Sequence, residues 1–199
     1  MATYKGIQGY SVKKLSSDPT ASQAEGQLWY NSGTGKFKIS VAGAAAWASG
    51  NNMNTARSGT TGAGIQTAAF IAAGSTGPAS VALHEQYDGS TWTEAADINT
   101  LRNETANAGT TAAGLIFGGN APNDDLTETW NGTSWAETSD LNTGRSYLGR
   151  AGTQTAALAI AGYNPGSTYI TNTESYNGTS WSETGDLGTA TNTIMCGGI

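Results

Sequence analysis

The clearest repeated segment of the chain reads Tyr176-Asn177-Gly178-Thr179-Ser180-Trp181-Ser182-Glu183-Thr184-Gly185-Asp186-Leu187. Two earlier segments match it closely: Trp130-Asn131-Gly132-Thr133-Ser134-Trp135-Ala136-Glu137-Thr138-Ser139-Asp140-Leu141 and Tyr87-Asp88-Gly89-Ser90-Thr91-Trp92-Thr93-Glu94-Ala95-Ala96-Asp97-Ile98. Periods of about 20 to 50 residues are typical of solenoids, propellers and arrays. The repeat therefore has to be interpreted before any single residue.

Several residue types keep the register of this repeat. Four tryptophans, Trp47, Trp92, Trp135 and Trp181, are spaced 45, 43 and 46 residues apart. An arginine follows each of the first three after ten residues, and a glycine follows all four after seventeen. A glutamate precedes each of the last three tryptophans by seven residues. A bias toward Gly, Ala and Thr would not hold Trp, Arg and Glu in register, so we interpret the set as structural. Its members are Trp47, Trp92, Trp135, Trp181, Arg57, Arg102, Arg145, Gly64, Gly109, Gly152, Gly198, Glu85, Glu128 and Glu174.

Composition narrows the class of protein. Charged residues make up 12% of the 199 residues, against about 25% in average soluble domains. The chain has 28 glycines and only 4 prolines, a profile typical of short strands joined by tight turns. The formal net charge of −6 argues against binding to a phosphate backbone, so no nucleic-acid partner is expected. No apolar run approaches the roughly 18 residues of a membrane helix, and neither membrane insertion nor a signal peptide is expected.

Each unit of the repeat is predicted to form four antiparallel strands. In the clearest unit we expect strands over 146–151, 155–161, 171–176 and 179–183. Asn177-Gly178 is expected to form a two-residue type I′ turn, because both residue types accept positive φ angles. No helical periodicity is present in 47–199, so the region is predicted to be all-β.

Residues 1–45 stand outside the repeat and are predicted to form a separate hairpin module. Its strands are expected at 27–30 and 36–40, with a turn over 31–35. The alternation of Lys36, Phe37, Lys38 and Ile39 places Phe37 and Ile39 on one face and both lysines on the other. The predicted organisation is therefore a docking module, 1–45, followed by a repeat region, 46–199.

The repeat region resembles the kelch family. The family marks are a glycine pair, then an aromatic residue, then a tryptophan; here they are Gly118-Gly119, Trp130 and Trp135, and Ala161-Gly162, Tyr176 and Trp181. The chain departs from the pattern because alanine replaces the first glycine at 73 and 161 and the aromatic-to-Trp gap is five residues. The resemblance implies kelch-like β-propeller blades, each a four-stranded antiparallel sheet.

The whole chain is also similar to repeat proteins of marine bacteriophages. The matching segments are Met1 to Tyr4, Gly26 to Asn31, Thr55 to Arg57, and Gly64 to Ala69 with Gly152 to Ala157. This resemblance implies a virion structural protein of the tail or tail fibre, made in the host cytoplasm and carried on the extracellular particle. Residues 1–45 would then contact other virion proteins.

The propeller is expected to be incomplete in this chain. Three complete Trp-to-Trp units and a truncated fourth are present, whereas propellers have about four to eight blades. Three explanations stay open: the chain is a fragment of a longer protein, several chains complete the ring as a homo-oligomer, or the arc packs against another component of a larger assembly.

The repeated polar and aromatic residues allow two interpretations. Arg57, Arg102 and Arg145, with the aspartates Asp97, Asp140 and Asp186, either line a carbohydrate-binding face or are structural. In the structural interpretation the aspartates cap the turns between blades and the arginines pair across neighbouring blades. We favour it, because binding sites usually break repeat symmetry. Likewise the tryptophans are expected to fill the space between blades rather than to stack on sugars.

Other candidate residues carry weaker signals. Cys196 is the only cysteine and His84 the only histidine, so one chain has neither a disulfide nor a His-based triad, and no role is expected for His84. Asn123-Asp124-Asp125 lacks the spacing of a calcium loop. No catalytic residue, cofactor or metal is predicted.

The segments between the second and third strands differ in every copy and are the predicted ligand-contact loops. Variable loops on a fixed scaffold are where recognition usually lies. The candidate residues are Ser75, Thr76, Asn120, Asn123, Asp124, Asp125, Tyr163 and Asn164.

We therefore expect a non-enzymatic phage structural protein that presents a propeller surface for assembly and host attachment. The alternative is a lectin-like propeller that recognises a host surface glycan or protein. A sialidase-like enzyme would need clustered acids, arginines and a tyrosine that break the symmetry, and none is visible in the sequence.

Overall fold

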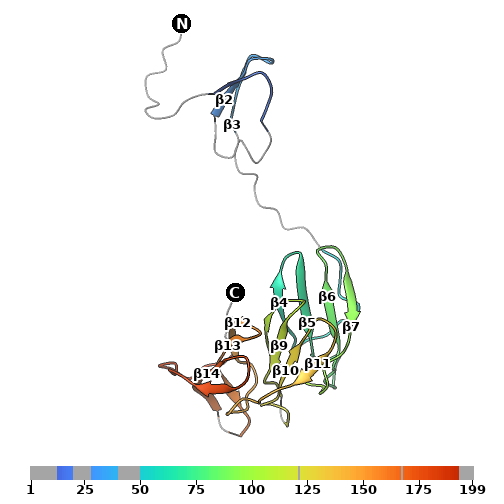
Figure 1. Cartoon of the computed structure of the whole chain (residues 1–199), viewed down its shortest axis with the longest axis vertical. Helices are drawn as coiled ribbons and strands as arrows, with labels where there is room; N and C mark the ends of the chain where they lie inside the picture. The colour runs from blue at the N-terminus through green and yellow to red at the C-terminus, as the bar shows by residue number, and fades with distance from the viewer. Residues whose placement is uncertain (1–12, 20–27, 40–49, 121, 167, 193–199) are drawn as a thin grey trace. The chain divides into compact units, whose positions relative to one another are not determined.

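A computed structural model describes residues 13–19, 28–39, 50–120, 122–166 and 168–192 (Figure 1). The chain forms two compact units, Met1–Ser49 and Gly50–Ile199. All regular structure within the described ranges is β, so the predicted all-β class is confirmed and no described helix could cross a membrane. Trp47, Cys196 and Gly198 lie outside the described residues.

The N-terminal unit contains a three-stranded sheet of order β1-β2-β3. Its strands are β1 (Lys13–Leu15), β2 (Leu28–Asn31) and β3 (Lys36–Ile39). The predicted hairpin is confirmed as β2 and β3, and β1 adds a parallel edge. Asp18 accepts hydrogen bonds from Trp29 Nε1 at 3.2 Å, Asn31 Nδ2 at 2.7 Å and Lys38 Nζ. These contacts lower the pKa of Asp18 to about 2, and the hydrogen bond from Lys38 has the largest effect.

The second unit contains three four-stranded antiparallel sheets, each with its strands in chain order. Sheet I consists of β4 (Thr61–Ile65), β5 (Ala68–Ala72), β6 (His84–Tyr87) and β7 (Trp92–Ala95). Sheet II consists of β8 (Ala106–Gly109), β9 (Gly114–Phe117), β10 (Thr127–Trp130) and β11 (Trp135–Glu137). Sheet III consists of β12 (Gly149–Thr153), β13 (Ala156–Asn164), β14 (Thr168–Tyr176) and β15 (Trp181–Glu183). Four strands per unit were predicted correctly, although β12 starts three residues later than expected and β14 three residues earlier.

The predicted type I′ turn is wrong. Tyr176 and Trp181 are the last pair of β14 and β15, so the loop has four residues. Only Gly178 has a positive φ, of 93°. The Asn177 side chain closes the loop instead, because its Oδ1 accepts from the backbone N–H groups of Thr179 and Ser180, each at 2.9 Å.

The register glycines are required by the hairpin between the first and second strands. Gly64, Gly109 and Gly152 have φ angles of 119°, 94° and 106°. A Cβ at Gly152 would lie 2.0 Å from the carbonyl oxygen of Ala156, and the other two positions are equally closed. Only glycine combines that φ with that approach.

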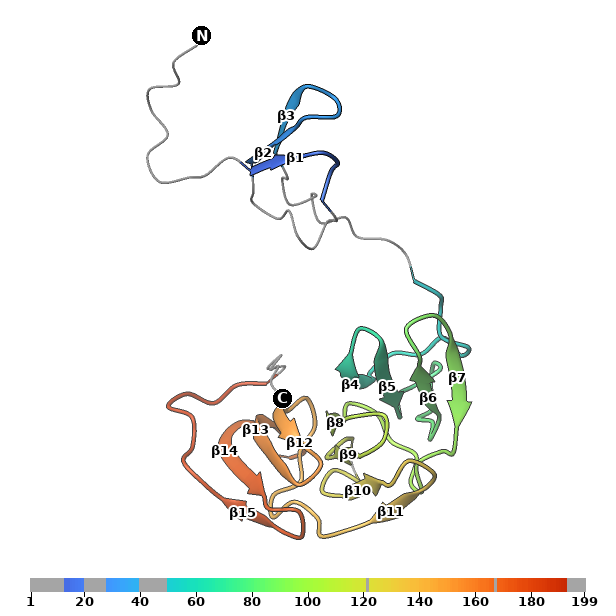
Figure 2. The same cartoon turned by 45° about the horizontal axis from the view of Figure 1, so that its top comes forward.

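The three sheets follow one another as a fan (Figure 2). The first strands β4, β8 and β12 lie side by side, β4 with β8 and β8 with β12, while β7, β11 and β15 form the outer edge. Thr61 Oγ1 donates to the carbonyl of Thr105 at 2.9 Å, which joins β4 to the segment before β8. One apolar cluster fills the space between sheets I and II and a second fills that between sheets II and III. The core is therefore made at the sheet-to-sheet interfaces.

Candidate functional site

A buried ion pair joins the start and the third strand of sheet III. Arg145 Nη2 lies 2.9 Å from Glu174 Oε1, and neither side chain is exposed. The Glu174 carboxylate also accepts from the backbone N–H groups of Asn142 at 2.8 Å and Thr143 at 3.2 Å. Asn142 Nδ2 donates to the same carboxylate at 2.9 Å and to the carbonyl of Trp181 at 3.2 Å. We call this set the clamp, because it ties the link from sheet II onto β14 and β15.

The clamp recurs in the other two sheets. Arg102 lies 3.0 Å from Glu128 in sheet II, and Arg57 lies 2.8 Å from Glu85 in sheet I. Asn99 and Asn54 take the place of Asn142, so the segment Asn-Thr-x-Arg is present three times. The prediction that the arginines pair across neighbouring blades is therefore wrong. Each link crosses the end of the sheet that it enters, which brings the arginine to the third strand of that same sheet.

Burial acts on the guanidinium groups of the clamps. Desolvation lowers the pKa of Arg102 and of Arg145, and the charges of Glu128 and Glu174 oppose that shift. An arginine keeps its charge even so, since its ordinary pKa lies above about 12. Each clamp is thus a charged pair closed off from water.

Two of the three repeated aspartates bond to the third strand of their own sheet. Asp140 Oδ1 accepts from the backbone N–H of Thr127 at 3.1 Å, and Asp186 Oδ1 accepts from that of Thr173 at 3.0 Å. They lie at the start of each link, as predicted, but they hold the outer strand to the third strand rather than capping the link.

Two tryptophans fill the space between sheets, as predicted. Trp135 and Trp181 are 6% and 5% exposed. Trp135 packs on Phe70 of sheet I with ring centroids 6.1 Å apart, and Trp181 packs on Phe117 of sheet II at 4.9 Å. Trp92 is partly exposed.

Each of these indoles also donates a hydrogen bond to the preceding sheet. Trp135 Nε1 lies 3.1 Å from His84 Nδ1, and Trp181 Nε1 lies 3.0 Å from Thr127 Oγ1. His84 and Thr127 are the first residues of β6 and β10. His84 thus has a structural role, contrary to the prediction that it has none.

The environment of His84 fixes its charge. Its Nδ1 lies 3.1 Å from both Trp135 Nε1 and the carbonyl of Ala96. Nδ1 can accept from the indole N–H only when it is unprotonated and can donate to the carbonyl of Ala96 only when it is protonated, so it makes one of these two hydrogen bonds at a time. Burial lowers the pKa of His84, which favours the neutral form of the ring.

Several polar groups of the predicted ligand-contact loops make hydrogen bonds within the chain. Ser75 is buried, and its Oγ bonds to the carbonyls of Gly77 and Ala79 at 2.8 and 2.9 Å. Asn120 Oδ1 accepts from the N–H of Asn103 at 2.8 Å, and Asn164 Nδ2 donates to the carbonyl of Gly144 at 2.7 Å.

The remaining loop residues are more accessible. Asn123, Asp124 and Asp125 are half-buried and Thr76 is exposed. The carbonyls of Asp124 and Asp125 accept from the N–H groups of Arg145 and Leu141 at 2.8 and 2.9 Å. The backbone of this loop therefore binds the link between sheets II and III. Within the described ranges, no three His, Cys, Asp or Glu side chains converge on a metal site.

Sheet III departs from the other two at the β13–β14 hairpin. Both strands have nine residues, whereas the equivalent strands of sheets I and II have four or five. Tyr163 and Tyr169 pair across this hairpin with ring centroids 6.2 Å apart and are 39% and 53% exposed. The extension presents two aromatic faces to solvent at one of the predicted loops.

Neither a family model nor a curated protein matches the chain. The role of the chain is therefore proposed below from the contacts of its own residues and from the resemblance of its sequence to kelch repeats and to phage repeat proteins.

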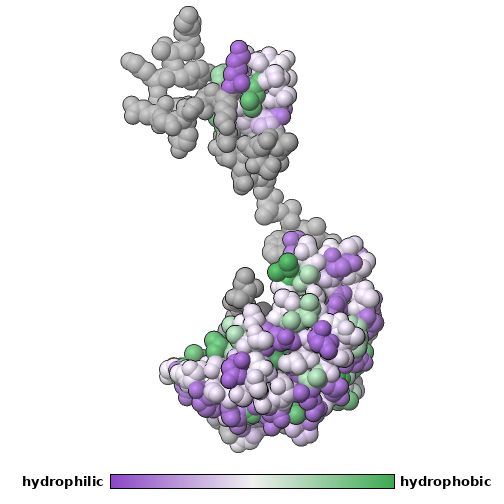
Figure 3. Space-filling view, in the orientation of Figure 1, coloured by the Kyte–Doolittle hydropathy of each residue, from purple (hydrophilic) through white to green (hydrophobic). Residues whose placement is uncertain are grey.

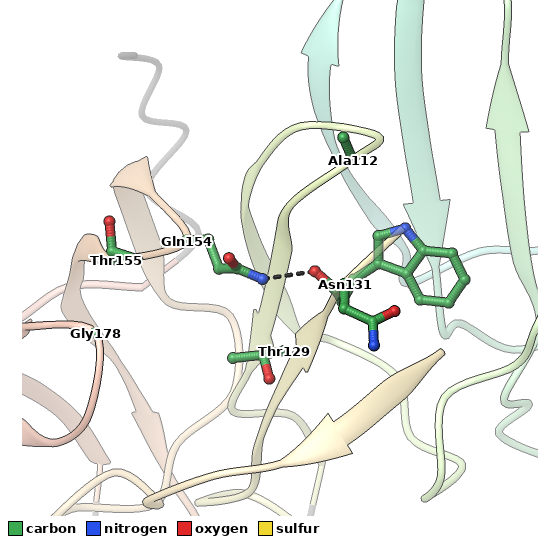
Figure 4. Close-up of a pocket in the computed structure, with 7 residues that line it drawn as sticks. Ala112, Thr129, Asn131, Gln154, Thr155 and Gly178 are labelled. Carbon is green, nitrogen blue, oxygen red and sulfur yellow. Dashed lines mark hydrogen bonds between the residues drawn. The ribbon is translucent and has the colours of Figure 1, made fainter. Parts of the chain in front are cut away.

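A groove of about 450 Å³ lies at the opposite ends of the strands, between the hairpin turns of sheets II and III. Gln154 reaches across it, and its Nε2 donates to the carbonyls of Trp130 at 2.6 Å and Gly114 at 3.1 Å (Figure 4). Sequence reasoning missed this groove, because its walls come from turns that the repeat makes alike. It is lined by Ala112, Thr129, Trp130, Asn131, Gln154, Thr155 and Gly178.

Proposed function

We propose that the chain is a non-enzymatic structural protein of a bacteriophage virion, a component of the tail or tail fibre. The observation that carries this proposal is the threefold clamp. The arginine and glutamate side chains of the repeat are buried in every copy, and the asparagine beside them donates to the backbone of the fourth strand. Residues kept in register for that purpose build a scaffold, and the similarity to phage repeat proteins supports a scaffold on a virion.

The three sheets are proposed to be blades of a kelch-like propeller. Four-stranded antiparallel sheets, grouped first strands and tryptophans between sheets all favour this architecture. Function inferred from a fold is an analogy, so the virion role needs its own test.

The N-terminal unit is proposed to dock onto other virion proteins. Its β2–β3 hairpin presents Phe37, which is 57% exposed and lies 5.1 Å from the Tyr30 ring. An exposed aromatic residue on a small sheet suits a contact with a partner protein.

The test is to quantify peptides of this chain in purified phage particles. We expect a fixed number of copies per particle, greater than one. When the phage encodes a chain without residues 1–45, its particles should contain no copies of that chain. Absence of the chain from particles whose lysate contains it would contradict the proposal.

A second function, glycan recognition, is favoured by Tyr163 and Tyr169. Exposed aromatic faces stack on sugar rings, and this pair breaks the repeat. A glycan array probed with the chain should give binding that Tyr163→Ala and Tyr169→Ala abolish. Leu101→Ala is the matched control, because Leu101 is 55% exposed and lies outside this hairpin. Binding unchanged by both tyrosine substitutions would rule out this site.

A further inference from the structure

The two interfaces between sheets follow one rule. The following sheet brings an aromatic pair, Trp130 with Trp135 or Tyr176 with Trp181. The preceding sheet brings apolar residues of its second strand and one acceptor, the residue directly before the clamp glutamate on its third strand. Each interface thus has a donor half and an acceptor half.

Within the described residues, nothing occupies the acceptor half of sheet III. Thr173 holds the position of Thr127 and is 6% exposed, and its Oγ1 is buried and has no hydrogen-bond partner within the described residues. Leu158 holds the position of Leu115, and Leu187 that of Leu141. Both are 36% exposed, whereas Leu115 and Leu141 are 0% and 5% exposed. Figure 3 shows apolar residues at the surface where β13 and β14 lie in Figure 1.

The donor half of sheet I likewise has no occupant in the part of the chain that the structure describes. Tyr87 and Trp92 hold the positions of Tyr176 and Trp181, with ring centroids 5.1 Å apart. Both rings are partly exposed, and Trp92 Nε1 makes no hydrogen bond within the described part of the chain. The two outer faces are therefore complementary halves of the interface that the chain makes twice internally.

We propose that sheet III binds sheet I of a second copy of this chain. In that contact Trp92 of the partner subunit donates its Nε1–H to Thr173 Oγ1, and its ring covers Leu158. A second copy is the occupant because one chain carries both halves, and a head-to-tail contact between identical copies satisfies both. Two copies bring six sheets, within the range of about four to eight blades in closed propellers. This inference rests on the contacts between sheets and fails independently of the virion role.

The first test is the mass of the chain in solution by sedimentation velocity at micromolar concentration. We expect a species of twice the 20.3 kDa chain mass. Leu158→Glu and Trp92→Ser should each give monomers, while the control Leu101→Glu, at an exposed leucine on neither face, should remain a dimer. Mixing the two monomeric variants should restore a dimer, since each retains the half that the other lacks. A monomeric wild type, or dimers that survive both substitutions, would overturn the proposal.

The second test uses Thr173 itself. Thr173→Val removes a hydroxyl that is unpaired in the monomer, so monomer stability should not fall, but the dimer dissociation constant should rise about 25-fold, which is about fivefold for each of the two contacts in the dimer. Trp92→Phe should have the same effect, and the double variant should show little further loss. Thr127→Val is the control, because it deprives Trp181 of its acceptor and should destabilise the monomer. An unchanged dissociation constant in Thr173→Val would refute the contact.

Discussion

Arg102 and Glu128 form an ion pair at 3.0 Å in which neither side chain reaches solvent. Buried ion pairs often contribute little net stability, because desolvation offsets the attraction. This carboxylate gains more than the arginine, since it also accepts from Asn99 and Thr100. The pair therefore fixes where the link crosses the sheet, and with it the position of the next interface.

Removing the charge of Glu128 should be costly. Glu128→Gln leaves the Arg102 guanidinium buried without a counter-charge, and we expect a loss of about 3–5 kcal/mol in the free energy of unfolding. Urea denaturation measures it, and the exposed Glu137→Gln serves as the control, expected within about 0.5 kcal/mol of wild type. The double variant Arg102→Met/Glu128→Leu should lose less than Glu128→Gln alone. A loss below about 1 kcal/mol for Glu128→Gln would contradict the clamp.

Stability should depend on pH through His84. Burial lowers its pKa in the folded state, whereas in the unfolded chain the pKa is about 6.5. As the pH falls below about 6.5 the unfolded state takes up a proton that the folded state resists, so stability is lost, by at most about 1.4 kcal/mol per pH unit.

The variant His84→Thr isolates this effect. It installs the residue that the repeat has at Thr127 and Thr173, and threonine can still accept from Trp135. Unfolding free energies at pH 7.5, 6.5 and 5.5 should decline less steeply in His84→Thr than in wild type. Parallel declines would show that His84 does not titrate with folding.

The position before the repeated glycine should respond asymmetrically to substitution. Gly118 has a φ of 67°, and a Cβ there would lie 2.7 Å from the carbonyl of Arg145. We expect Gly118→Ala to cost about 2 kcal/mol, because the left-handed conformation alone costs alanine about 1–2 kcal/mol. Thermal denaturation measures it.

Ala161 is the natural control for Gly118, since it holds that position in sheet III with a φ of 52°. Ala161→Gly should change stability by less than about 1 kcal/mol, because relief of strain offsets the loss of a buried methyl group. If Gly118→Ala and Ala161→Gly changed stability by the same amount, the local packing at this position would be alike in sheets II and III, which would contradict the prediction.

The spacing of the tryptophans defined the repeated unit, and the pattern within that unit predicted four strands. It also predicted the burial of Trp135 and Trp181 between sheets. The partner of each arginine could not be predicted from spacing, because Glu85 and Glu128 each lie between two repeat arginines, and the arginine nearer in sequence is not the one that each of them pairs with. The acceptor position was hidden for another reason. It is His84 in one sheet and Thr127 or Thr173 in the others, so only the shared ability to accept an indole N–H relates these residues.

Cryo-electron microscopy of the native particle that contains this chain tests the account most directly. We predict four-stranded sheets that follow one another around an axis on the tail or its fibres, with Trp135 and Trp181 enclosed between them and Thr173 covered by a further sheet. Finding these segments in unlike surroundings, or the face of sheet III open to solvent in the particle, would contradict it.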